Sequence, residues 1–186
     1  MLHLLIDRNV FKIISLFALS PGSRFSRKEM KERVRLHNVP LDGTLAVLRK
    51  AGVLQREGRL YALDFGSEEG KTLVQLAVRQ YRSFRELPFD VYLLVTDLAA
   101  FLATAQVDVY VFGSYAKLVY RQDSDVDIAV LSTGTPDRQV TSLLAAKLEK
   151  TYHKRIEFHY FDRTRFTKNK KDPLVKEILK NGIRIL

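Results

Sequence analysis

Residues 111–131, VFGSYAKLVYRQDSDVDIAVL, contain the strongest pattern in the sequence. An apolar run over Val107–Phe112 predicts a strand that ends at a Gly-Ser turn, and a polar loop follows. A second apolar run then opens with Asp125 and Asp127. Because side chains two positions apart in a strand lie on the same face, we expect both carboxylates to reach one point in space.

Two carboxylates that lie close together raise each other's proton affinity unless a cation lies between them. Hard oxygen ligands of this kind suit Mg²⁺, which completes its shell with water and phosphate oxygens. Gly113 lets the backbone approach a phosphate closely, and Ser114 offers a hydroxyl and an amide as donors. The pattern therefore predicts a metal and phosphate site. The alternative is a polar hairpin, since Asp and Ser are also ordinary turn formers.

The spacing of the polar residues favours the metal and phosphate site. The motif is Gly113-Ser114-x-Ala116-Lys117, followed by Ser124-Asp125-x-Asp127. It resembles the signature of the minimal nucleotidyltransferases of the DNA polymerase beta superfamily, with Leu118 where that family usually has glycine. The nucleotide-binding residues that the resemblance implies are Gly113, Ser114, Lys117 and Ser124.

A third acidic residue lies in a later strand. Residues 154–161, KRIEFHYF, alternate between apolar and polar side chains, which predicts a strand with Glu157 in its middle. The resembled family has a third carboxylate at this place, usually Asp, and Glu157 matches it. The implied catalytic and metal-binding residues are Asp125, Asp127 and Glu157. The alternative for Glu157 is an ion pair with Arg155 on an exposed face.

Two further features lie near this strand. His159 shares the face of Glu157 and could contact substrate or metal, although a lone histidine is more often a surface or packing residue. Residues 163–176 carry six Lys and Arg against a single acid, Asp172. This segment could contact triphosphate, RNA or an acidic partner, and the alternative is a solvated loop.

The N-terminal part of the chain has a different pattern. Amphipathic spacing predicts three helices and then two short strands. The helices are expected at 9–19, with Asn9 as the cap, at 26–36, with a Ser26 and Glu29 capping box, and at 41–51, after a turn at 37–40. The strands are expected at 53–55 and 60–63. This order, and the stretch LRKAGVLQREGRLYALD over 48–64, resemble a winged helix-turn-helix domain.

In winged helix domains the third helix usually enters the major groove of DNA, and the wing contacts the backbone. The DNA-binding residues that the resemblance implies are Thr44, Arg49, Lys50, Arg56 and Arg59. The net charge of the chain is +10, and residues 1–64 hold 12 Lys and Arg against 6 Asp and Glu, an excess that attracts nucleic acid. The alternative is a protein-docking module, because Gly43 weakens the third helix.

The polar segment 65–70 separates two predicted domains. Residues 1–66 are expected to form the winged helix-turn-helix domain, and residues 67–186 the nucleotidyltransferase domain with a connecting helix. Further helices are expected at 72–87, 91–103, 136–150 and 173–180, and a short edge strand at 183–186. The predicted fold class is α/β (α+β), with a mixed sheet flanked by helices in the second domain.

Composition limits where the protein works. The chain has no cysteine, which excludes disulfides and thiolate metal sites. No apolar run approaches the roughly 20 residues of a membrane span, and charged residues interrupt the apolar N-terminus, unlike a signal peptide. We therefore expect a cytoplasmic protein without a membrane partner.

The resemblance also implies an activity. A two-metal nucleotidyltransferase uses Mg²⁺ or Mn²⁺ to move a nucleoside monophosphate from a nucleoside triphosphate, here expected to be ATP, to a hydroxyl, and releases pyrophosphate. Minimal nucleotidyltransferases often act as antitoxins that modify a tyrosine of a helical HEPN partner, and a fused winged helix would add DNA targeting or autoregulation. The alternative is a DNA-binding regulator whose second domain senses nucleotide or docks a partner without catalysis.

Overall fold

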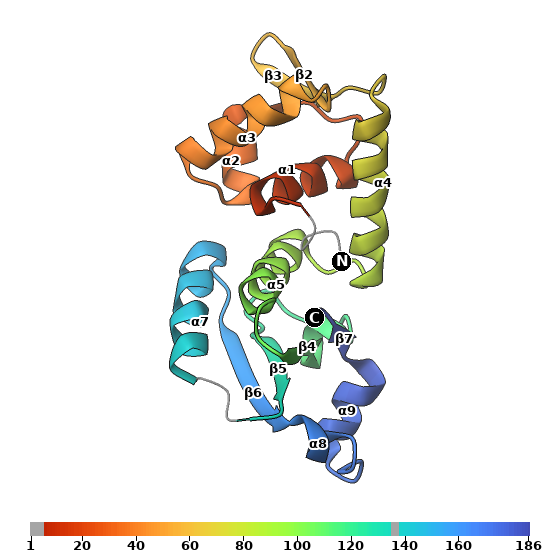
Figure 1. The fold of residues 1–186 in the computed structure, drawn as a ribbon, viewed down its shortest axis with the longest axis vertical. Coiled ribbons are helices and arrows are strands. Elements are labelled where there is room, and N and C mark those ends of the chain that lie inside the picture. The colour runs from red at the N-terminus through yellow and green to blue at the C-terminus, as the bar shows by residue number, and fades with distance from the viewer. Residues whose placement is uncertain (1–5, 135–137) are drawn as a thin grey trace. The chain divides into compact units, whose positions relative to one another are not determined.

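The structure is a computed structural model that describes residues 6–134 and 138–186. The chain divides into two compact units, Met1–Ser83 and Phe84–Leu186, and each is described by itself. Their helices and strands are labelled in Figure 1. The helices accompany two sheets, one of them mixed, which confirms the predicted α+β class. Among the described residues, no helix combines the length and the apolar character needed to cross a membrane.

The first unit combines helices with a small antiparallel sheet in the strand order β1-β3-β2. Its elements are α1 (Arg8–Leu19), β1 (Phe25–Ser26), α2 (Arg27–Val34), α3 (Asn38–Lys50), β2 (Leu54–Glu57), β3 (Leu60–Leu63) and α4 (Glu68–Ser83). Buried apolar side chains from the first three helices, such as Phe17, Met30 and Leu45, form its core.

Side-chain caps determine where the first two helices begin. The Asp7 carboxylate accepts hydrogen bonds from the N–H groups of Asn9 (2.8 Å) and Val10 (3.0 Å), so α1 begins earlier than predicted and Asn9 is not its cap. A carboxylate suits this position because it also complements the positive end of the helix dipole. The predicted capping box of α2 is confirmed by the reciprocal bonds between Ser26 and Glu29.

The third helix differs from its prediction. The turn expected at 37–40 is wrong, because α3 begins at Asn38 and takes in Pro40. Proline is tolerated in the first turn of a helix, where its missing N–H has no acceptor in any case. The inward side chains Leu41, Leu45 and Leu48 are buried as expected.

Helix α4 belongs to the first unit, where it packs against α1. The sequence had suggested this helix as the connecting element of the second domain. The predicted domain limits, 1–66 and 67–186, stay a prediction.

The second unit is built on a mixed four-stranded sheet in the order β6-β5-β4-β7. Strand β4 is antiparallel to β5 and β7, and β5 is parallel to β6. The predicted strand 107–112 and the predicted edge strand at the C-terminus are confirmed, and the predicted helix start at 135–137 lies outside the described residues. The elements are α5 (Phe89–Leu102), β4 (Val107–Phe112), α6 (Gly113–Ala116), β5 (Val126–Ser132), α7 (Arg138–Tyr152), β6 (Ile156–Asp162), α8 (Arg163–Phe166), α9 (Pro173–Asn181) and β7 (Ile183–Arg184).

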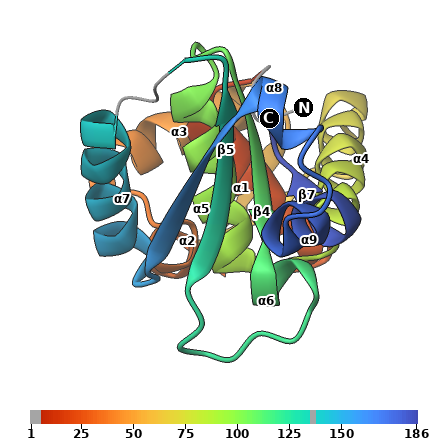
Figure 2. The same cartoon turned by 90° about the horizontal axis from the view of Figure 1, so that it is seen from below.

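Alternation along the strands divides this sheet into two faces. On one face, Phe112, Ala129 and Leu131 form an apolar cluster with residues of α8 and α9. On the other, α7 contacts β6 through the hydroxyls of Thr141 and Tyr160. Figure 2 shows the sheet with α8 and α9 beside it and the long loop that joins α6 to β5. Asp127 shares the face of Phe112, its cross-strand partner, so the candidate site lies on the α8 and α9 face.

Candidate metal and nucleotide site

The turn after β4, which begins at Gly113 and is called the Gly113 turn below, brings the backbone against the Asp127 carboxylate. Gly113 has a φ of +68°, which L residues rarely adopt. A Cβ added at this position would overlap Asp127 Oδ2 and come within 2.8 Å of Asp127 Cγ. Two independent requirements, backbone conformation and space, therefore specify glycine, and the turn and Asp127 form one site.

The loop after this turn is closed by its own hydrogen bonds. The carbonyl oxygen of Ser114, a half-buried residue of α6, accepts from Val119 N–H (3.0 Å). Ser124 Oγ accepts from Arg121 N–H (2.8 Å). Ser124, predicted to bind nucleotide, thus holds the loop in the present conformation.

Leu118 lies in this loop with a φ of +59°. The resembled family usually has glycine here, and the left-handed backbone gives the physical reason. In this chain a leucine adopts the left-handed conformation, and its side chain is 55% exposed.

Lys117, predicted to bind nucleotide, forms an ion pair with Glu177 of α9, with Nζ and Oε1 2.9 Å apart. Both side chains are partly exposed, so an ion pair of this kind contributes about 1 kcal/mol or less. Lys117 can therefore exchange Glu177 for a phosphate at small cost.

The two aspartates of the motif have different surroundings. Asp127 lies in β5, whereas Asp125 precedes the strand, so the prediction that the strand opens at Asp125 is wrong. The ladder begins at Val126, whose N–H donates to Arg155 O (2.9 Å). Asp125 Oδ1 lies 2.8 Å from Arg155 Nε, close enough for an ion pair but not in hydrogen-bonding geometry.

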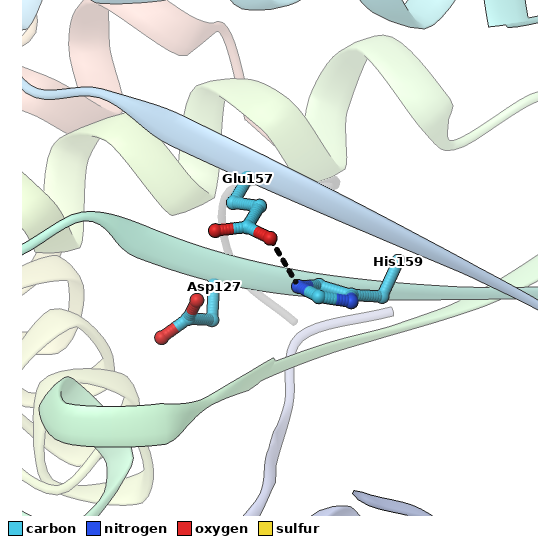
Figure 3. A group of neighbouring side chains, drawn as sticks. All are labelled: Asp127, Glu157 and His159. Atoms are coloured by element: carbon cyan, nitrogen blue, oxygen red, sulfur yellow. Dashed lines mark ion pairs between the residues drawn. The ribbon is translucent and has the colours of Figure 1, made fainter.

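Strand register brings a second carboxylate and an imidazole to Asp127. Glu157 is the parallel partner of Asp127, and His159 follows two positions later on the same face of β6. The possible ligand atoms of the three residues all lie within 4.8 Å of one another. Figure 3 shows the three side chains as neighbours, and its dashed line marks the ion pair between Glu157 and His159. His159 Nε2 lies 3.2 Å from Glu157 Oε1. The sequence signal for His159 was its place two residues after Glu157.

The charges of this cluster act on Asp127. Burial raises the pKa of Asp127 above its ordinary value, and the charge of Glu157 raises it further. His159 lowers the pKa, and Asp125 and Glu177 add smaller increases. A carboxylate that resists ionisation in this way is stabilised by a cation.

The residues present fit a divalent cation. The three donors are two carboxylates and an imidazole, which are common metal ligands. Asp125 Oδ1 and His159 Nε2 are buried atoms without a well-formed hydrogen bond among the described residues. The absence of a Cβ on Gly113 allows the Asp127 carboxylate to lie against the turn. The arrangement can hold a cation next to a turn whose amides can bind phosphate.

Arg85 also supports the turn, and nothing in its sequence surroundings signalled this. Its guanidinium Nη1 donates to Ala116 O (2.9 Å) at the end of α6 and to Asn181 O (2.8 Å) at the end of α9. Arg85 has a φ of +53°, an uncommon conformation for arginine.

The basic segment after β6 is only partly engaged. Arg163 forms an ion pair with Asp108 (2.8 Å), and Asp172 caps α9. Lys170, Lys176 and Lys180 line an open hollow with Leu179.

The predicted DNA-binding residues lie in the first unit. Thr44 is 7% exposed and its hydroxyl donates to Pro40 O (2.7 Å), so it faces the interior and is not on a surface that DNA can reach. Amphipathic spacing predicted the helix, but Thr44 lies on its buried side together with Leu45 and Leu48. The other four candidates are exposed: Arg49, Lys50, Arg56 and Arg59.

Comparison with known proteins gives one family model and two solved structures that are similar to parts of the chain. A family model described as "Polymerase beta, Nucleotidyltransferase" matches residues 100–186. Two solved structures, both of mutants of the toxin-antitoxin pair MntA-HpeT, are also similar. One is 20% identical, over 50% of this chain and 72% of that chain, with a TM-score of 0.39. The other is 24% identical, over 52% and 68%, with a TM-score of 0.35. No curated protein matches the chain.

Proposed function

We propose that this protein transfers a nucleoside monophosphate from a nucleoside triphosphate to a hydroxyl group, because residues 100–186 match the polymerase beta nucleotidyltransferase family model. The observation that carries the proposal is the close approach of the Gly113 turn to Asp127, which would bring a bound phosphate next to a bound cation. The expected substrate is ATP with Mg²⁺ or Mn²⁺.

The residues of the proposed site have different roles. Asp125, Asp127 and Glu157 would hold divalent cations, which when bound would neutralise phosphate charge and lower the proton affinity of the acceptor hydroxyl. The amides of the Gly113 turn and the hydroxyl of Ser114 bind the leaving phosphates. Lys117 exchanges Glu177 for the triphosphate, and Ser124 keeps the loop closed.

The reaction is an in-line displacement at the α-phosphorus. The acceptor oxygen forms a bond to this phosphorus as its proton passes to solvent. The bond between the α-phosphorus and the oxygen that bridges to the β-phosphorus breaks, and pyrophosphate leaves with the electron pair.

We test this activity with ATP labelled at the α-phosphate, each divalent cation in turn and protein acceptors. Asp127→Asn should abolish transfer, because it removes a charge that faces the cation. Asp123→Asn, at an exposed aspartate of the loop before β5, should retain it. Absence of transfer by the wild type with every cation and acceptor, or undiminished transfer by Asp127→Asn, would overturn the proposal.

The acceptor is proposed to be a tyrosine of a helical HEPN-type protein, as the motif between Gly113 and Asp127 implies. The candidate is the product of a neighbouring gene. Mass spectrometry after incubation with ATP should find one added nucleoside monophosphate, or several, on a tyrosine of that protein. Nucleotidyl transfer to RNA, and not to a protein, would overturn this assignment of the acceptor.

The first unit is proposed to be a winged helix domain that binds DNA. The element order α1, β1, α2, α3, β2, β3 supports this, as do the exposed Arg49 and Lys50 on α3 and Arg56 and Arg59 near the β2–β3 turn. Autoregulation is the expected role. Fluorescence anisotropy should show tighter binding to DNA from upstream of its own gene than to random duplex.

Substitutions separate this DNA contact from general charge. A double Arg49→Ala and Lys50→Ala variant should lose affinity and show a smaller salt slope. Arg79→Ala, at an exposed arginine of α4, should change binding little. Equal affinity for all duplexes would argue against sequence-specific binding.

A second function is favoured by one observation. Lys117 and Asp125 are both held in ion pairs, with Glu177 and Arg155. A regulator whose second unit senses nucleotide without catalysis would keep such pairs. That protein would bind triphosphate without transferring it, which the labelled-ATP experiment distinguishes.

A further inference from the structure

We propose that His159 is a ligand of the cation held by Asp127 and Glu157, and that this mixed nitrogen and oxygen site prefers Mn²⁺ to Mg²⁺. The inference rests on the proposed function, since the cation is the one that serves nucleotidyl transfer. It adds a ligand to that site and selects the metal.

The backbone places the three side chains together. Asp127 and Glu157 are register partners across the parallel β5–β6 pair, and His159 pairs in the same ladder with Ala129. Because positions two apart share a face, the imidazole lies on the face of both carboxylates. This placement follows from strand pairing and does not depend on a loop.

The spacing of the donor atoms matches a coordination shell. Small divalent cations bind six ligands at about 2.1 Å, so neighbouring ligand atoms of an octahedron lie about 3.0 Å apart. His159 Nε2 and Glu157 Oε1 are 3.2 Å apart. The possible ligand atoms of all three residues lie within 4.8 Å, close to the span of one shell.

The imidazole is already held in position. His159 is 27% exposed, and its ring packs edge-on against Phe112, with ring centroids 5.1 Å apart. Its Nε2 is buried and makes no well-formed hydrogen bond among the described residues. A cation at this nitrogen would therefore displace no well-formed hydrogen bond, and the ring would lose little freedom.

Asp125 is oriented differently. Its Oδ1 faces Arg155 Nε at 2.8 Å, so in this conformation its charge is balanced by a guanidinium. The described residues that converge on one point are Asp127, Glu157 and His159. The imidazole nitrogen of His159, and not an oxygen of Asp125, is therefore the third protein ligand of the cation that binds first.

The donor set determines the metal. Carboxylates and water suit Mg²⁺ and Mn²⁺ alike, whereas imidazole suits transition metals. Mg²⁺ dehydrates reluctantly and is usually held by one or two carboxylates. An imidazole beside two carboxylates therefore raises the affinity for Mn²⁺ more than that for Mg²⁺.

Electron paramagnetic resonance tests the proposal on the full chain, because free Mn²⁺ gives a six-line signal that bound Mn²⁺ loses. The wild type should bind Mn²⁺, with Mg²⁺ competing weakly. His159→Gln should weaken Mn²⁺ binding about tenfold or more, since even outer partners of metal ligands change affinity by roughly 10–100-fold. His37→Gln, at an exposed histidine of the first unit that caps no helix through its side chain, is the matched control.

Pulsed resonance of the wild-type Mn²⁺ complex supplies a readout that needs no variant. An imidazole ligand should give a nitrogen-14 modulation, which disappears in His159→Gln. Absence of this modulation, absence of Mn²⁺ binding, or equal Mn²⁺ affinity of wild type and His159→Gln would each overturn the proposal. If His159→Gln misfolds by circular dichroism, the wild-type modulation decides alone. Nitrogen coordination without any nucleotidyl transfer would support the ligand and overturn the proposed function.

Discussion

At the scale of single residues, the site requires a residue without a Cβ at position 113. Gly113 directly follows β4 and Asp127 lies in the neighbouring strand β5, and a Cβ on Gly113 would occupy the space of the Asp127 carboxylate. The left-handed backbone adds a second reason for glycine. The motif is therefore a packing requirement as well as a phosphate-binding turn.

Gly113→Ala should destabilise the protein by about 2–4 kcal/mol, because left-handed strain and overpacking add. It should also abolish Mn²⁺ binding. Urea unfolding measures the first effect and paramagnetic resonance the second. Gly43→Ala is the matched control, since nothing lies within 4 Å of its added Cβ and alanine favours helix α3, so stability should rise by up to about 1 kcal/mol. Wild-type stability of Gly113→Ala would contradict the packing argument.

Leu118→Gly should stabilise the protein by roughly 0.5–1 kcal/mol. Glycine removes left-handed strain of about 1–2 kcal/mol and restores about 0.5–1 kcal/mol of unfolded-state entropy. The leucine side chain is exposed, so little packing is lost. Val119→Gly, at the next exposed position without a positive φ, should destabilise instead. Thermal unfolding of both variants compares them, and a lower melting temperature for Leu118→Gly would refute the strain argument.

Asp127→Asn should raise the stability of the metal-free protein by about 0.5–1 kcal/mol at neutral pH, a trade of function for stability. The pKa of Asp127 is raised, mainly by burial and then by Glu157, so the folded state binds its proton more tightly than the unfolded state. The resulting stability is complete below the unfolded pKa and is lost as pH rises through the folded pKa. The advantage of the asparagine should therefore appear at neutral pH and vanish at acidic pH.

Urea unfolding at acidic and neutral pH, without metal, measures this difference. Added Mn²⁺ should reverse the order, because it stabilises only the protein that binds it. A stability advantage of Asp127→Asn that does not depend on pH would contradict the assignment to ionisation.

At the scale of elements, α6 and α9 are held together from a distant part of the chain. Arg85 donates to Ala116 O and Asn181 O, and the latter bond joins residues 96 positions apart. The guanidinium satisfies the carbonyl at the last residue of the short helix α6, Ala116. Arg85 is a positioning residue, because it contacts the turn and not the cluster.

Arg85→Ala should destabilise the protein by about 1–2 kcal/mol, since two carbonyls lose a charged donor. It should also raise KM for triphosphate more than it lowers kcat, because the turn binds phosphate. Arg85→Lys should rescue only part of the effect, since one ammonium lacks the fork of a guanidinium. Steady-state kinetics measures both constants. Arg82→Ala, at an exposed arginine of α4, is the control for the loss of one positive charge. An unchanged KM of Arg85→Ala would contradict the positioning role.

At the scale of the whole molecule, two compact units carry separate cores. Ligand binding stabilises the unit that binds, by about 2.7 kcal/mol at a ligand concentration of 100 Kd. Mn²⁺ with a non-hydrolysable ATP analogue should therefore slow hydrogen exchange in β4, β5 and β6 by up to about 100-fold and leave α1–α3 unchanged. Duplex DNA should slow hydrogen exchange in α1–α3 and leave β4, β5 and β6 unchanged. Mass spectrometry locates the protection, and equal protection of both units by ATP would show that they unfold together.

The sequence by itself determined the local features. The strand 107–112, the Gly-Ser turn, the α2 capping box and the edge strand follow from neighbouring residues, and the Gly113 to Asp127 motif lies within the residues that the nucleotidyltransferase family model matches. Such features depend on spacing within one segment, which the sequence displays directly.

Only the tertiary structure decided the contacts between distant segments. It placed His159 beside Asp127, paired Asp125 with Arg155, brought Arg85 to Asn181 and turned Thr44 inward. Each of these depends on strand register or on the rotation of a helix, which the packing of whole faces determines. A one-residue shift between β5 and β6 would move His159 to the opposite face, and no local pattern excludes that shift.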